Sequence, residues 1–120
     1  MMLRIFKSFL YAFHGLKIAF KQEQNFRIQI IGGILVIAAA LFFPLRGWEL
    51  VTVIALVMAV LVMELLNTVV EHFTDLLKPR MHHYVSVVKD IMAAAVLLTA
   101  LGAVIIGGII FYPHLVNLFK

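Results

Sequence analysis

The chain has 120 residues, of which 64% are hydrophobic and 13% are charged; it has no cysteine, and its net charge is +4. Soluble domains are usually about half apolar and about one-quarter charged, and a chain this short cannot hide so much apolar surface in a water-facing core. The composition therefore excludes a soluble globular domain and a disulfide framework, and it predicts one lipid-embedded domain over residues 1–120.

Residues 3–21 are expected to form an amphipathic helix that lies in the membrane interface. One broad face of this helix is apolar and comprises Ile5, Phe9, Ala12, Phe13, Leu16, Ala19 and Phe20. The opposite face is basic and comprises Arg4, Lys7, His14, Lys17 and Lys21. Because these basic residues lie beside membrane spans, they favour a role at the membrane surface over nucleic-acid binding.

Three apolar runs follow, and each is predicted to cross the membrane as a helix, because lipid cannot satisfy open backbone groups. The spans are expected at about residues 28–45, 50–70 and 91–112. A polar break at 22–27 precedes the first span, and turn residues from Pro44 to Gly47 close it. The predicted fold is therefore an all-α membrane protein with an interfacial helix and three transmembrane helices.

The second span carries polar side chains that a lipid-facing helix would exclude. Its polar residues are Glu64, Asn67, Glu71 and Asp75, at successive spacings of three, four and four residues. These spacings place all four on one face of the helix, as a ladder that runs to its C-terminal end. A charge at membrane depth costs roughly 2.5–3.5 kcal/mol on insertion scales. Exposure of Glu64 to lipid is therefore unfavourable.

Further polar residues are expected at the same membrane level, namely Glu23 and Asn25 before the first span and Lys89 and Asp90 before the third. Clustered carboxylates suit Mg²⁺ bound together with phosphates, and a lysine can neutralise phosphate charge. A deeper carboxylate can accept a proton from an alcohol. The pattern predicts a site where a water-soluble phosphate donor meets a lipid acceptor. The alternative is a non-catalytic membrane scaffold or assembly subunit, whose ladder only holds helices together.

Three separate motifs support a family resemblance. The central stretch reads Glu64-Leu-Leu-Asn67-Thr68-Val-Val-Glu71 and continues to Asp75. Lys89-Asp90 is followed by Ala93-Ala94-Ala95-Val96-Leu97. The N-terminal part contains Ser8-Phe9, Tyr11-Ala12, Gly15 and Glu23-x-Asn25-Phe26-Arg27-Ile28. Over about residues 4–111 the chain resembles the small prokaryotic lipid kinases that include diacylglycerol kinase and undecaprenol kinase.

This resemblance implies ATP-dependent phosphorylation of a lipid hydroxyl by a homotrimer in the bacterial cell membrane, with sites shared between neighbouring subunits. It implies that Glu64 is the general base and that Glu23 and Glu71 hold the Mg²⁺ of Mg-ATP. The other implied nucleotide-binding residues are Tyr11, Gly15, Asn67, Lys89 and Asp90.

The family pattern also bears on the lipid acceptor, and the chain departs from this pattern at two places. The stretches 25–28 and Asp75-Leu76 look more like undecaprenol kinases than diacylglycerol kinases, so undecaprenol is the favoured acceptor and diacylglycerol the second possibility. Gln29 stands where Gram-positive members commonly have histidine, and Val69-Val70 replaces the more usual Ala-Ile. Both departures leave the implied chemical groups intact.

Lysine and arginine residues are unevenly distributed about the predicted spans. Eight precede the first span or lie between the second and third: Arg4, Lys7, Lys17, Lys21, Arg27, Lys78, Arg80 and Lys89. The remaining two, Arg46 and Lys120, lie on the other side. Since cytoplasmic loops carry the excess of basic residues, the N-terminus and the segment 78–89 are predicted to face the cytoplasm.

Single cysteines test this orientation, because the chain has none of its own. In intact cells, a membrane-impermeant thiol reagent should label Gly47→Cys and should leave Ser8→Cys and Ser86→Cys unlabelled until the membrane is permeabilised. Labelling of either serine variant without labelling of the Gly47 variant would reverse the predicted topology.

Overall fold

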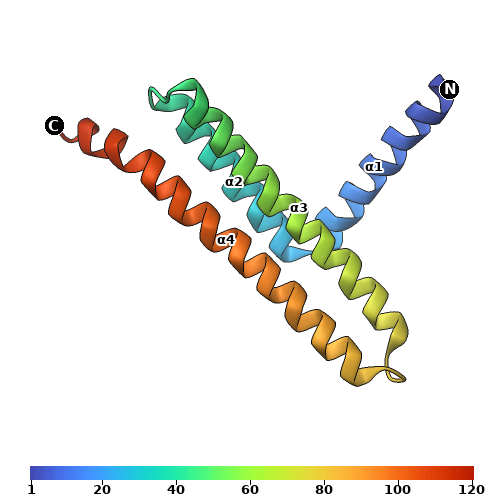
Figure 1. The fold of residues 1–120 in the computed structure, drawn as a ribbon. Helices are drawn as coiled ribbons and strands as arrows, with labels where there is room; N and C mark the ends of the chain where they lie inside the picture. The colour runs from blue at the N-terminus through green and yellow to red at the C-terminus, as the bar shows by residue number, and fades with distance from the viewer.

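A computed structural model describes all 120 residues, and almost all of them are helical. The four helices are α1 (Met2–Gln22), α2 (Gln24–Phe42), α3 (Gly47–Leu77) and α4 (His82–Leu118). By length and composition, α2, α3 and α4 can each cross a membrane. These three helices lie alongside one another, whereas α1 projects away from them (Figure 1). The predicted all-α architecture, with an amphipathic helix and three spans, is confirmed.

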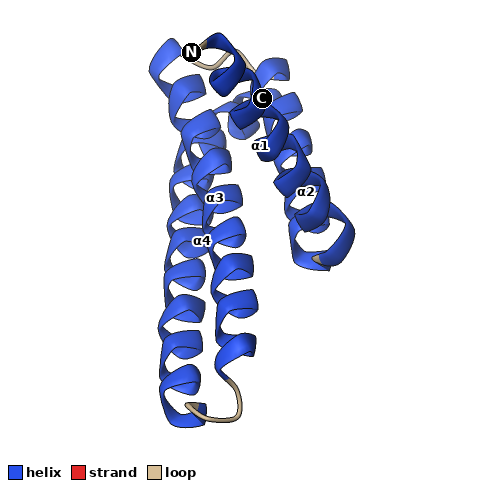
Figure 2. Cartoon of the chain, turned by 90° about the vertical axis from the view of Figure 1, so that its right-hand side faces the viewer, coloured by secondary structure: helices blue, strands red, loops and turns tan.

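The second and third spanning helices extend well beyond the membrane. With 31 residues in α3 and 37 in α4, their lengths are about 46 Å and 55 Å at 1.5 Å per residue. The hydrocarbon core of a bilayer is only about 30 Å thick. The connected ends of α3 and α4 therefore project beyond it as an antiparallel pair, closed by a short loop (Figure 2).

The polar break before the first span is shorter than the sequence predicts. It narrows to Glu23, whose extended backbone separates α1 from α2, and residues 24–27 form the first turn of α2. The guanidinium of Arg27 donates hydrogen bonds to the carbonyl oxygens of Phe20, at 2.7 Å, and Lys21, at 2.9 Å. These carbonyls have no partner within their own helix. Arg27 thus ties the end of α1 to the start of α2.

Helix α1 buries very little of its surface within the chain. Ala19 is its one buried residue, and aromatic side chains of its apolar face such as Phe9 and Phe13 are exposed. An amphipathic helix with a free apolar face suits the boundary between headgroups and acyl chains.

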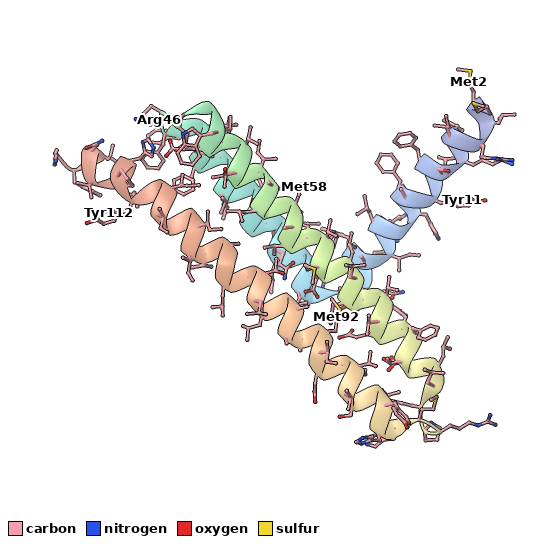
Figure 3. The ribbon with its side chains drawn as sticks, in the orientation of Figure 1. Met2, Tyr11, Arg46, Met58, Met92 and Tyr112 are labelled. Atoms are coloured by element: carbon pink, nitrogen blue, oxygen red, sulfur yellow. The ribbon has the colours of Figure 1, made fainter.

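The hydrophobic core lies at the end of the bundle farthest from α1. It consists of one residue from each spanning helix, Ala40, Val53 and Ile110. A buried carboxylate reinforces this end, because Oε1 of Glu49 accepts the backbone N–H of Arg46 at 2.9 Å and lies 3.3 Å from Nε2 of His114. The three spans are therefore fastened together at the Arg46–Tyr112 end of the molecule (Figure 3).

Little else is buried within one chain. Only ten of the 120 residues are buried, and the accessible surface is 9185 Å². A soluble globular protein of this mass would expose roughly 6,500 Å². The outer faces of the helices therefore require lipid or further protein as their surroundings.

Helix α2 approaches α3 most closely at Gly33. A Cβ atom added to Gly33 would lie 2.8 Å from Cγ1 of Val57, whereas one added to Gly32 would meet nothing within 4 Å. Small residues allow membrane helices to pack backbone against side chain in this way. Gly33, and not its neighbour, therefore sets the spacing between α2 and α3.

Gly33→Ala and Gly32→Ala form a matched pair that tests this contact, because both replacements gain the same helix propensity. Gly33→Ala should be less stable than Gly32→Ala by about 1–3 kcal/mol, the usual cost of overpacking a tight site. Unfolding of each variant in detergent measures the difference. Equal stability of the two would mean that the close approach of α2 does not matter.

Candidate active site

A buried carboxylate lies where α2 and α3 face each other. Glu64, in the middle of α3, is 2% exposed. The side-chain amide of Gln29, on α2, donates a hydrogen bond from Nε2 to Oε2 of Glu64 at 3.3 Å. Oε1 of Glu64 and Oε1 of Gln29 are both buried and have no partner. Buried polar atoms are nearly always paired, so these two oxygens need an explanation.

The polar ladder of α3 lines a cavity next to this pair. Asn67 donates from Nδ2 to Oε1 of Glu71 at 3.2 Å, which holds the two side chains together. With Glu64, Asn25 and Lys89 they line a cavity of about 380 Å³, and residues of α4 form its other side. One chain thus gathers carboxylate and amide oxygens and one ammonium group around a single space.

Gln29 of this pair also lines an apolar groove of about 530 Å³. It lies between α2, α3 and α4, and glycines on both α2 and α4 leave it open. Its lining includes Gln29, Gly32, Val57, Gly107 and Phe111. Gln29 lines the groove and Glu64 lines the polar cavity, so the hydrogen bond between them joins the walls of the two spaces.

Lys89 also takes part in ion pairs at the projecting ends of α3 and α4. Its Nζ lies 3.4 Å from Oδ1 of Asp75, and Nζ of Lys78 lies 3.8 Å from the same oxygen. Because exposed ion pairs of this kind contribute little free energy, Lys89 is available to another anion at small cost.

The structure brings together only some of the residues that the sequence singles out. Glu64, Asn67, Glu71 and Lys89 share the polar cavity. The other four are not among its lining residues. Tyr11 and Gly15 are exposed on α1, and Tyr11 lies far from the other helices (Figure 3). Glu23 lies between α1 and α2, and Asp90 is exposed on α4. No three side chains of His, Cys, Asp or Glu gather where they could hold a metal ion.

Sequence reasoning assigned no catalytic or binding role to two residues of the cavity region, although it placed Asn25 at the same membrane level as the site. Asn25 lines the polar cavity, and Gln29 contacts Glu64 directly. Gln29 is the one strongly polar residue in the apolar run 28–43. A lone amide in an apolar span is costly unless it has a partner, and this signal pointed to a contact with another polar group.

The arrangement suits a reaction between a polar and an apolar reactant. Carboxylate and amide oxygens are the ligands that hard cations such as Mg²⁺ prefer, and Glu71, Asn67 and Asn25 supply them. Lys89 supplies positive charge for phosphate oxygens. Glu64 lines this cavity and contacts Gln29 of the groove, and its buried Oε1 has no hydrogen-bond partner.

The chain matches a known protein family and several known proteins. The family described as prokaryotic diacylglycerol kinase matches residues 10–111. A diacylglycerol kinase of Synechocystis sp. is 38% identical over 112 residues, which are 92% of this chain and 64% of that protein. An undecaprenol kinase of Bacillus subtilis is 33% identical over 93% of this chain and 91% of its own length. A diacylglycerol kinase of Escherichia coli is 31% identical over 92% and 91%. The chain thus spans less than two thirds of the Synechocystis protein but nearly all of the other two.

Proposed function

The chain belongs to the prokaryotic diacylglycerol kinase family of membrane lipid kinases, and we propose that it transfers the γ-phosphate of Mg-ATP to the hydroxyl of a membrane lipid alcohol. The observation that carries the proposal is the meeting of a polar cavity and an apolar groove at Glu64. The charged and polar side chains of the cavity suit a nucleoside triphosphate with its cation, and the apolar lining of the groove suits a hydrocarbon chain. The reacting hydroxyl then lies at their junction.

Glu64 acts as the general base in this proposal. The lipid hydroxyl oxygen attacks the γ-phosphorus, the hydroxyl proton passes to Oε1 of Glu64, and the bond from the γ-phosphorus to the bridging oxygen breaks to release ADP. The free Oε1 supports this role, because an oxygen already hydrogen-bonded would be a poorer acceptor.

Residues further along α3 and α4 bind the phosphates. Glu71 on α3, together with Glu23 between α1 and α2, would hold Mg²⁺, which would neutralise charge on the phosphate oxygens. Asn67 orients Glu71 through their hydrogen bond at 3.2 Å. Lys89 contributes its ammonium group at the cavity, with Asp90 beside it in the chain. Tyr11 and Gly15 on α1 complete the nucleotide site.

The acceptor is a lipid alcohol with a long hydrocarbon chain, for which the groove provides an apolar surface. Its volume, about 530 Å³, falls within the range of small-molecule sites. Undecaprenol is the favoured acceptor and diacylglycerol the second candidate, following the stretches 25–28 and Asp75-Leu76. The site lies at the cytoplasmic face of a bacterial inner membrane, in keeping with the distribution of lysine and arginine residues.

A homotrimer accounts for the groups that one chain leaves apart. Glu64 and Glu71 are seven residues apart, about 10 Å along the helix axis, and Glu23 does not line the polar cavity. Helix α3 also exposes an apolar stripe at spacings of seven, four and seven residues, which suits helix association. Its members are Val51, Met58, Val62 and Val69. Association through this stripe would let a neighbouring subunit supply Glu23 and α1 to the site.

Glu64→Gln tests the chemical step. The variant should bind Mg-ATP like the parent but lose phosphoryl transfer by about 10²–10⁴-fold, the usual loss of a general base. Vesicles that carry either undecaprenol or diacylglycerol, with Mg-ATP outside, provide the turnover assay and identify the acceptor. Equilibrium nucleotide binding is measured on the same preparation.

Glu71→Gln is the matched variant, since it makes the same replacement seven residues further along α3. It should weaken Mg-ATP binding as well as turnover, because it removes a charged ligand of the cation. Thr52→Val, at the far end of α3, serves as the control with parental activity. Turnover of Glu64→Gln within a few-fold of the parent would remove Glu64 from the mechanism, and no turnover of either lipid by the parent would favour a scaffold.

A further inference from the structure

We propose that Gln29 is a positioning residue for phosphoryl transfer: its amide fixes the rotamer of the Glu64 carboxylate so that Oε1 faces the acceptor hydroxyl. This inference rests on the proposed role of Glu64 as the base. Gln29 comes from a different helix than the ladder of α3, and it is one of the residues that line the apolar groove. It is therefore placed to align the base with the reactant that enters from the groove.

The hydrogen bond between Gln29 and Glu64 can have only one direction when Glu64 is ionised. An ionised carboxylate can only accept, so the amide NH₂ of Gln29 must be the group that faces it. This bond, from Nε2 to Oε2 at 3.3 Å, occupies one of the two carboxylate oxygens. The second oxygen, Oε1, is left without a partner. A neutral donor thus distinguishes two oxygens that are otherwise equivalent.

Two unpaired oxygens leave this pair able to accept a hydrogen bond from a third group. Glu64 is 2% exposed, and its Oε1 is unpaired together with Oε1 of Gln29. If Gln29 served only to join α2 to α3, a contact that left both oxygens unsatisfied would be a poor solution, because a buried unpaired acceptor costs about 1–3 kcal/mol. A lipid hydroxyl arriving from the groove supplies the missing donor.

The neutrality of Gln29 matters because other charges already surround the base. Glu71 on α3 and Lys89 on α4 line the same cavity, and Glu23 lies at the start of α2. A second carboxylate at position 29 would repel Glu64, and a cation there would compete with the hydroxyl for its charge. An amide orients the carboxylate without changing the charge of the site.

Gln29→Met tests the hydrogen bond, because methionine keeps the length of the side chain and removes both polar atoms. We expect kcat to fall about tenfold to a hundredfold, since small misplacements of a reacting group have costs of this size. The KM for Mg-ATP should stay within about threefold of the parent, because Gln29 does not line the polar cavity. Thr52→Val again controls for the loss of a half-buried polar group in a span.

Gln29→Glu provides a readout that packing alone would not change. A protonated Glu at position 29 can donate to Glu64 as the amide does, so the variant should turn over when the two carboxyls share one proton. When that proton is lost, the donor is lost and the two charges repel. Turnover of Gln29→Glu should therefore fall at alkaline pH over a range where the parent remains constant.

The outcomes separate this inference from the proposed function. If Glu64→Gln abolishes turnover while Gln29→Met keeps a kcat within twofold of the parent, Gln29 does not position the base, although Glu64 retains its role. Matching pH profiles for Gln29→Glu and the parent would likewise overturn the inference, even if Gln29→Met failed to fold. Near-parental turnover of Glu64→Gln would instead defeat the proposed base itself.

Discussion

A carboxylate buried within a membrane-crossing helix is the constraint on which the rest of the structure depends. Glu64 is 2% exposed on a helix that must face lipid or protein over most of its length. Lipid offers it no hydrogen bond, so α2 has to approach closely enough for Gln29 to reach it. Gly33, one helical turn away, permits this approach because a Cβ there would strike Val57. Glu49 and His114 join α3 to α4 at the opposite end, and the apolar groove runs from Gln29 towards that end, as far as Val53 and Phe111.

A single chain leaves much of its apolar surface without protein contacts. Its accessible surface of 9185 Å² is far above that of a soluble protein of this size, and the excess is apolar helix surface. Helix α1 diverges from the other helices at Glu23 (Figure 1), and neither Tyr11 nor Gly15 on it lines the polar cavity of its own chain. Both features fit the proposed trimer, in which α1 lies along the interface and reaches a neighbour's site. Phosphate chemistry then stays at the membrane surface while the acceptor remains in lipid.

The sequence predicts the helices well because hydrophobic run length is a strong signal in a membrane protein. It also predicts that Glu64, Asn67 and Glu71 share a face, since a helix fixes the direction of residues three, four and seven apart. Spacing within one helix says nothing about the register between helices, and the contact of Gln29 with Glu64 depends on that register. Helix ends were also less predictable, because the projecting ends of α3 and α4 are polar and lack the apolar signal of a span.

A structure of the protein in lipid with a non-hydrolysable Mg-ATP analogue and a lipid alcohol tests the central claim most directly. The account predicts the acceptor hydroxyl at hydrogen-bond distance, about 2.6–3.2 Å, from Oε1 of Glu64. The hydrocarbon chain should lie in the groove between α2 and α4, and the triphosphate should lie beside Asn67, Glu71 and Lys89. A hydroxyl bound on another face of the helices, with Glu64 still contacting only protein, would contradict the account.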